Sequence, residues 1–130
     1  MTIPSDYNGI ITEQYLNENP NVIFVFGDNT LGKGKAGAAV LRDHPQALGF
    51  ITKKFPSNHD GAFYNPVTYQ VVYYQQVMNL KNTIRKNPDK TFLISKLGGN
   101  LANKFGIFEK IIEPNLKKDL SEYSNVVFLW

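Results

Sequence analysis

The stretch that decides the fold is FVFGDNTLGKGKAGAAVL, residues Phe24 to Leu41. It joins the end of an apolar run, residues 22–26, to a glycine-rich segment and then to AGAAVLRD, residues 36–43, which favours a short helix. An apolar run without alternation is typical of a strand buried on both faces of a parallel or mixed sheet. The stretch therefore predicts a unit of strand, glycine loop and helix.

A second unit of the same kind lies near residue 90. The apolar run TFLIS, residues 91–95, predicts another buried strand, and the segment KLGGNLANKFG, residues 96–106, follows it directly. Because strands and helices alternate along the chain, we expect an α/β fold. We predict three layers, with a mostly parallel, mixed central sheet flanked by helices.

Capping and breaking residues predict the other elements. Asn65-Pro66 should begin a long amphipathic helix that ends at Arg85, and Pro114 should kink or divide a last helix. A short helix is expected over residues 10–18 and a final strand over 125–129. Residues 46–64 are interpreted as irregular, with GFITKKF as a candidate strand. The expected apolar face of the long helix comprises Val67, Val71, Tyr74, Val77, Met78, Leu80 and Ile84.

Composition limits the domain count and the classes of function. A chain of 130 residues with 42% hydrophobic residues fits a single domain, residues 1–130. The absence of cysteine excludes disulfides and thiolate ligands, and two distant histidines do not form a zinc pattern, so we predict no metal and no other cofactor. With no leader pattern and no apolar run long enough for a membrane span, a cytoplasmic protein without membrane contact is expected.

The charge pattern narrows the partners. The net charge of +3 is mild, and the lysines are scattered along the chain. This balance favours a small anionic ligand, whereas nucleic-acid binding is not expected because no basic stripe is interleaved with aromatic residues. The oligomeric state is left open.

Two nucleotide-binding patterns can be laid over the first loop. Gly27 to Lys33 read G-x-x-x-x-G-K, as in the phosphate loop of nucleoside triphosphatases, but Gly34 stands where that motif needs a hydroxyl for magnesium. Gly32, Gly34 and Gly37 read G-x-G-x-x-G, as in dinucleotide-binding folds, but five residues separate the apolar run from Gly32. Both patterns stay as weaker alternatives.

Taken together, the two loops resemble a known family. The segments FVFGDNTLGKGKAGAAV, FLISKLGGNLANKFGIFEKIIEPNL and NVVFLW are similar to the macro domain family, and most of all to small macro-like proteins, often encoded by phages, of the ADP-ribose 1''-phosphatase type. The resemblance implies a macro-like fold that binds ADP-ribose or a related nucleotide through two glycine-rich loops. It leaves open whether the ligand is hydrolysed, by 1''-phosphatase or ADP-ribosyl hydrolase activity, or only sequestered, for example in phage counter-defence.

The resemblance also assigns residues to the site. Asn29 matches the asparagine that contacts the distal ribose and takes part in hydrolysis, and Asp28 is the second catalytic candidate. An acidic residue that reads the adenine amino group is expected near the first strand, where Asp6 and Glu13 are the nearby candidates. The predicted ligand-binding residues are Gly27, Gly32, Lys33, Gly34, Lys35, Ala36, Gly37, Leu97, Gly98, Gly99, Asn100, Leu101, Ala102, Asn103, Phe105 and Gly106.

Structural roles remain alternatives for several residues. Asp28 can equally be a turn or capping residue, and Asn29 a turn residue in the left-handed region. We expect His44 to cap a helix end and His59 to be an exposed turn residue. The irregular segment 46–64 is a candidate lid.

Overall fold

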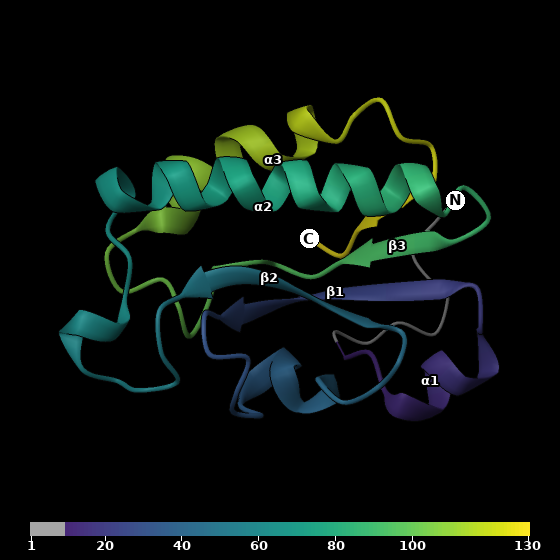
Figure 1. The fold of residues 1–130 in the computed structure, drawn as a ribbon, viewed down its shortest axis with the longest axis horizontal. Helices are drawn as coiled ribbons and strands as arrows, with labels where there is room; N and C mark the ends of the chain where they lie inside the picture. The colour runs from purple at the N-terminus through teal and green to yellow at the C-terminus, as the bar shows by residue number, and fades with distance from the viewer. Residues whose placement is uncertain (1–9) are drawn as a thin grey trace.

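The computed structural model describes residues 10–130 and contains a sheet of four parallel strands. The sheet order is β2-β1-β3-β4, and every neighbouring pair is parallel (Figure 1). The α/β class is thus confirmed, and this sheet is wholly parallel rather than mixed. The strands are β1 (Val22–Asn29), β2 (Ala47–Lys53), β3 (Thr91–Ile94) and β4 (Val126–Phe128).

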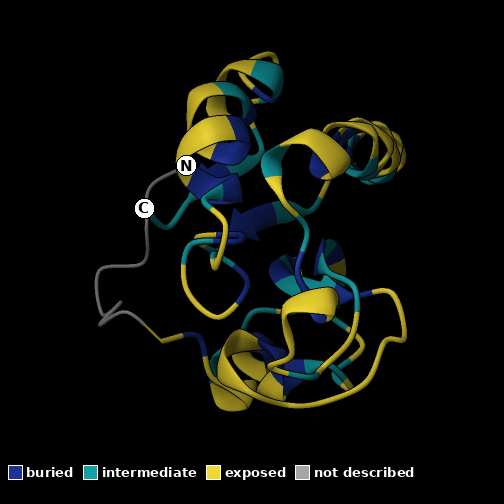
Figure 2. Cartoon of the chain, turned by 90° about the vertical axis from the view of Figure 1, so that its left-hand side faces the viewer, coloured by how far each residue is buried: buried dark blue, intermediate teal, exposed yellow. Residues whose placement is uncertain are grey.

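Helices cover both faces of the sheet, in agreement with the predicted three layers. Helices α2 and α3 lie over one face, and α1 with η1 lies over the other (Figure 1). Figure 2 shows the buried residues concentrated between these layers. The helical elements are α1 (Glu13–Glu18), η1 (Gly37–Leu41), η2 (Asp60–Ala62), α2 (Pro66–Lys86), η3 (Phe108–Ile112) and α3 (Glu113–Asp119).

Strand β1 is longer than its apolar run predicts. It continues past residue 26 to Asn29, because β2 pairs with it along its whole second half, with Gly27 opposite Phe50 and Asp28 opposite Ile51. Side chains on β1 alternate between the two cores, so that Phe24 and Phe26 face α1 and η1, whereas Val25 faces α2. The first glycine loop therefore starts only at residue 30.

Two neighbouring segments also differ from expectation. The segment expected to be helical over residues 36–43 forms only η1, a five-residue 3-10 helix, because its chain turns at Arg42 to reach β2. The supposedly irregular segment contains β2, over which the candidate strand GFITKKF is confirmed in part. β2 is followed by an isolated antiparallel bridge between Lys53 and Phe63.

Helix α2 begins as predicted but buries a different face. Asn65 and Thr68 form a reciprocal capping box at its start. The expected apolar residues of its first half lie in solvent, with Val67 79% exposed and Val71 66% exposed, whereas Tyr69 and Tyr73 are buried. The tyrosine face is the buried one because its rings fill more of the core and its hydroxyls have acceptors there. Tyr69 Oη donates to the Ile51 carbonyl oxygen at 2.6 Å, and Tyr73 Oη donates to Asp119 Oδ2 at 2.7 Å. Tyr74 and Met78 are exposed as well.

Pro114 divides the last helical segment, as predicted. A π-helical turn, η3, precedes it, and the proline occupies the first turn of α3, where a residue without an N–H is tolerated. The helix ends at Asp119, with Leu120 as its C-cap. None of the helices in residues 10–130 is long and apolar enough to cross a membrane.

The two buried tyrosines predict a loss of stability in alkali. Burial raises the pKa of both Tyr69 and Tyr73, and the hydrogen bond to Asp119 adds to the shift at Tyr73. Above pH 10 the unfolded chain loses protons that the folded chain keeps, so the free energy of unfolding should fall by about 1.4 kcal/mol per pH unit for each tyrosine. Urea unfolding at pH 9, 10 and 11 measures this slope.

A matched pair of variants assigns the slope to its source. Tyr73→Phe should reduce the alkaline slope by the contribution of one tyrosine, about 1.4 kcal/mol per pH unit. Tyr74→Phe, which changes an exposed ring on the same helix, is the control and should keep the wild-type slope. An equal slope in both variants would show that other groups cause the alkaline loss.

Candidate functional site

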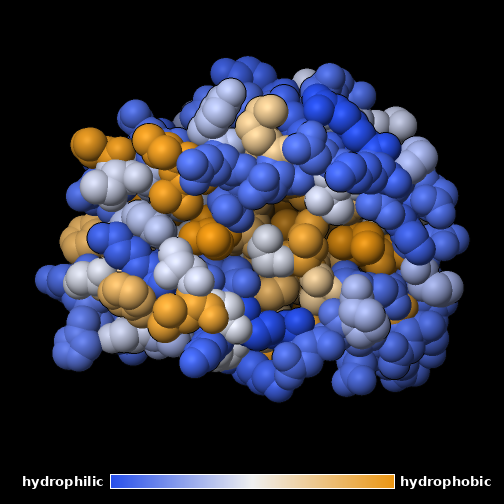
Figure 3. Space-filling view, in the orientation of Figure 1, coloured by the Kyte–Doolittle hydropathy of each residue, from blue (hydrophilic) through white to orange (hydrophobic). Residues whose placement is uncertain are grey.

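A cleft of about 960 Å³ opens at the carboxyl ends of the strands. The two central strands, β1 and β3, are neighbours. From β1 the chain continues to β2 at one edge of the sheet, and from β3 it continues to β4 at the opposite edge. Between two such strands the connections diverge, and this is where α/β folds bind ligands. Figure 3, drawn in the orientation of Figure 1, shows a different, smaller hollow with apolar side chains, between α2 and the middle of β2, while the carboxyl ends of the strands lie at the left of the view.

Most of the predicted site residues line this cleft. Both catalytic candidates, Asp28 and Asn29, are among them. Those predicted for ligand binding that line it are Gly27, Lys33, Gly34, Lys35, Ala36, Gly37, Gly98, Asn100, Leu101 and Ala102. Those that do not line it are Gly32, Leu97, Gly99, Asn103, Phe105 and Gly106.

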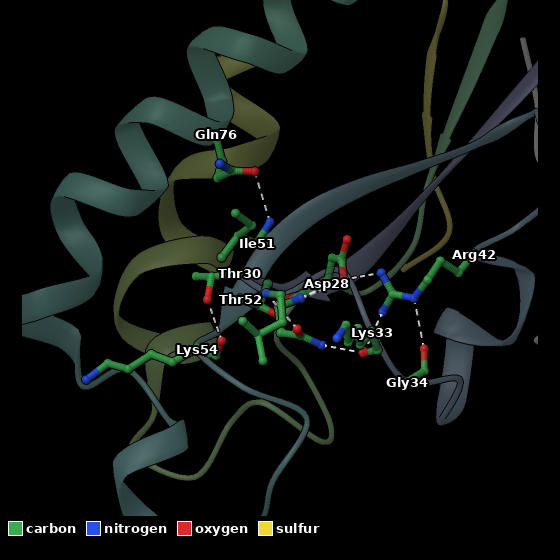
Figure 4. Close-up of polar contacts among 11 residues, drawn as sticks. Asp28, Thr30, Lys33, Gly34, Arg42, Ile51, Thr52, Lys54 and Gln76 are labelled. Atoms are coloured by element: carbon green, nitrogen blue, oxygen red, sulfur yellow. Dashed lines mark hydrogen bonds and ion pairs between the residues drawn. The ribbon is translucent and has the colours of Figure 1, made fainter.

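Arg42 holds the first glycine loop in shape (Figure 4). Its Nε donates to the Gly34 carbonyl oxygen at 2.9 Å, and its Nη2 to the Lys33 carbonyl oxygen at 3.1 Å. Its Nη1 forms an ion pair with Asp28 Oδ1 in which the arginine side chain is 13% exposed and the aspartate side chain 16% exposed. Gly49 has no Cβ, and this leaves room for the carboxylate, since a Cβ there would lie 2.4 Å from Asp28 Oδ2. The guanidinium thus fastens two loop carbonyls to the end of β1.

Asn29 supports the same loop from inside. Its Oδ1 accepts a hydrogen bond from the Leu31 N–H at 3.0 Å, and its Nδ2 donates to the Lys33 carbonyl oxygen at 2.7 Å. Asn29 does not have a positive φ, so it holds the turn through its side chain rather than through a left-handed backbone. With Asp28 bound to Arg42 and to the Asn29 N–H, both catalytic candidates serve to shape the loop.

The shaped loop presents a row of backbone donors. Within residues 10–130, the N–H groups of residues 33–38 donate to no protein acceptor. Gly34 and Gly37 have φ values of +91° and +60°, which only glycine adopts without strain. Successive unbonded N–H groups around such glycines form an anion-binding concavity. Because η1 is one short 3-10 helix, these amides, rather than a helix dipole, are the loop's contribution to anion binding.

The second loop approaches the first across the cleft. Gly98 has φ +72°, and Leu101 reaches so close to Gly37 that a Cβ on that glycine would lie 3.3 Å from Leu101 Cδ1. Further along the loop, Asn103 turns away from the cleft and caps η3, since its Oδ1 accepts from the Phe108 N–H at 3.0 Å. Phe105 packs edge-on against Phe63. Asn103 and Phe105 therefore have structural contacts outside the cleft.

The lining of the cleft is both cationic and apolar. Five basic side chains and one carboxylate line it. Arg42 pairs with Asp28, and Lys35 pairs with Asp43 at 2.6 Å, whereas Lys33, Lys53 and Lys96 have no ion-pair partner within residues 10–130. The large apolar side chains of the lining are Ile10, Ile11, Phe24, Val40, Leu41, Leu101 and Leu129.

Several cleft residues carry no recognisable sequence signal. Arg42 follows η1, and nothing in its local sequence distinguishes it from a solvent-exposed arginine. Lys53, Pro56 and Asn58 lie in the segment interpreted as irregular. The last three lie at the cleft because β2 pairs with β1, a pairing that the sequence alone does not reveal. A strand assignment for residues 47–53 would have been the signal.

The competing patterns fit the structure differently. Gly27, Asp28 and Asn29 belong to β1, so the G-x-x-x-x-G-K pattern begins inside a strand, and no α-helix follows it as a phosphate loop requires. The G-x-G-x-x-G pattern fits better than the sequence indicated. Because β1 extends to Asn29, only residues 30 and 31 separate the strand from Gly32, instead of five.

The remaining expectations concern histidines, metals and adenine. His44 lies where the chain leaves η1, with Nε2 2.7 Å from Asn17 Oδ1 and Nδ1 accepting from the Gln46 N–H, and His59 is exposed. No group of three or more metal-ligating side chains gathers in the described part of the chain. Glu13 is exposed on α1 and does not line the cleft, and Asp6 lies outside the described residues.

Comparison with known proteins identifies a family. A family model described as "Family of unknown function (DUF7831)" matches residues 6–103, which include β1, both glycines of the first loop that have positive φ in the cleft, and most of the second loop. No curated protein and no solved structure matches the chain.

Proposed function

The chain belongs to the family DUF7831, whose function is unknown, and we propose that it binds ADP-ribose or a closely related diphosphate nucleotide. One observation carries the proposal: residues 33–38, whose six consecutive amides are unbonded within residues 10–130, all line a cationic cleft at the point where the strand connections diverge. Backbone amides beside lysines that have no ion-pair partner within residues 10–130 suit a diphosphate, and the apolar lining of the cleft suits a base.

The same geometry favours binding over turnover. A general base or a water-positioning group needs a free polar atom that faces the ligand. The Asn29 amide is used at both its oxygen and its nitrogen by the loop, and in the Asp28 carboxylate Oδ1 is paired with Arg42 while Oδ2 lies against Gly49 of β2. We therefore propose a protein that holds a nucleotide, for example to sequester a signal, with hydrolysis as the alternative that the experiment separates.

Ligand binding is tested with a variant that blocks the cleft without straining the backbone. Gly34 is unsuitable because any side chain there would have φ +91°, but Ala36 is exposed and has an ordinary extended backbone. In calorimetry, wild-type protein should bind ADP-ribose, and Ala36→Glu should weaken binding at least tenfold, because its carboxylate would face the diphosphate. The panel includes ADP, AMP, NAD and ATP with and without magnesium.

The control adds the same charge elsewhere. Gln70→Glu, on the exposed side of α2 and away from the cleft, should bind like the wild type. Equal weakening by both variants, or wild-type binding of magnesium-ATP alone, would contradict the proposal. Recovery of intact ADP-ribose after prolonged incubation would support a binder, and recovery of cleaved product would establish an enzyme.

A further inference from the structure

The strand β2 and the segment after it form a third wall of the cleft. Thr52, Lys53, Pro56 and Asn58 line the cleft from this side, opposite the second glycine loop. The wall is tied to the first loop, since Thr30 donates from both its N–H and its hydroxyl to the Lys54 carbonyl oxygen, and the Lys54 N–H donates to the Ala62 carbonyl oxygen at 2.8 Å. Lys53 therefore has a defined position next to Asn29, its register partner on β1.

We infer that Lys53 binds an anionic oxygen of the nucleotide and so anchors the ligand from this third wall. The inference rests on the proposed function and adds to it a residue that neither glycine loop contains. Lys53 bridges Phe63 through the backbone, and its Nζ lies 4.6 Å from the centre of the Phe63 ring. Phe63 is itself buried and is held edge-on by Phe105 at 6.3 Å.

The charge of Lys53 lacks a counterion among residues 10–130. Partial burial lowers the pKa of this ammonium, which means that its charged form is less well solvated than in water. The Phe63 ring compensates for a part of that loss, but no carboxylate pairs with Lys53 within the described residues. A phosphate in the cleft would supply the missing charge where water is partly excluded and a charged hydrogen bond is strong.

The neighbouring lysine is a matched control. Lys54 also lies over an aromatic ring, with Nζ 5.4 Å from the centre of Tyr64, but it does not line the cleft. In calorimetry with ADP-ribose, Lys53→Met should raise the dissociation constant about 10- to 100-fold, whereas Lys54→Met should change it less than about twofold. Lys53→Arg should recover a large part of the affinity, since it keeps the charge. Thermal melting of each variant checks that the fold is retained.

The outcomes separate this inference from the proposed function. If wild-type protein binds ADP-ribose and Lys53→Met binds as tightly, the role of Lys53 is refuted while the function stands. If wild-type protein binds none of the nucleotides, the function fails, and NMR of the lysine ε-carbons with inorganic pyrophosphate still decides about Lys53. A shift confined to the cleft lysines, with Lys53 among them, supports an anion site, and an unmoved Lys53 signal overturns it.

Discussion

Arg42→Met should lower the free energy of unfolding by about 2–3 kcal/mol and weaken nucleotide binding at least tenfold. The variant loses the guanidinium over the Phe26 ring and leaves the Asp28 carboxylate without its cation and two loop carbonyl oxygens, of Lys33 and Gly34, without their donor. The first loop should then lose the fixed shape that holds its unbonded amides at the cleft. Urea unfolding and calorimetry measure the two effects.

The cause can be isolated by removing the carboxylate as well. Asp28→Asn combined with Arg42→Met should cost less stability than the two single costs added, because no unpaired charge remains. Lys35→Met removes another basic residue of the cleft whose ion pair with Asp43 is exposed, and it should hardly affect stability. Strictly additive costs would mean that Arg42 acts through something other than Asp28.

Gly98→Ala should destabilise the protein by about 2–5 kcal/mol, the sum of backbone strain and steric overlap. Gly98 has φ +72°, and a Cβ on it would lie 2.7 Å from Ile112 Cδ1, inside the core beneath the second loop. The loop cannot move away freely, because Leu97 and Ile112 on either side of this contact are fully buried. The measurement is the urea midpoint at constant slope.

Two other glycines separate the two contributions. Gly32 has φ +62°, and a Cβ on it would meet only Arg42 Nη1, at an ordinary 4.0 Å, so Gly32→Ala should show strain alone, about 1–2 kcal/mol. Gly61 has neither a positive φ nor an atom within 4 Å, and Gly61→Ala should change stability by no more than about 0.5 kcal/mol. Ile112→Val removes the Cδ1 atom and should recover the steric part of the Gly98→Ala cost. Equal costs at all three glycines would contradict this division.

Local sequence signals predicted the parts of the fold that depend on neighbouring residues. Apolar runs without alternation marked β1 and β3, Asn65-Pro66 marked the start of α2, and Pro114 marked the division of the last helix. The face of α2 was predicted correctly where Val77, Leu80 and Ile84 are buried, but wrongly in the first half of the helix, because a second apolar stripe runs along that half. Only the sheet beneath it, where the Ile51 carbonyl oxygen accepts from Tyr69, selects which stripe is buried.

For the candidate site, the sequence by itself determined that two glycine-containing loops follow two buried strands, since glycine's backbone freedom and strand burial are properties of short segments. Only the tertiary structure decided that these loops share one cleft, that Arg42 holds the first of them, and that Lys53 enters from β2. The physical reason is that each of these facts depends on the strand order, which brings together residues far apart in the chain, and no local preference encodes such a pairing.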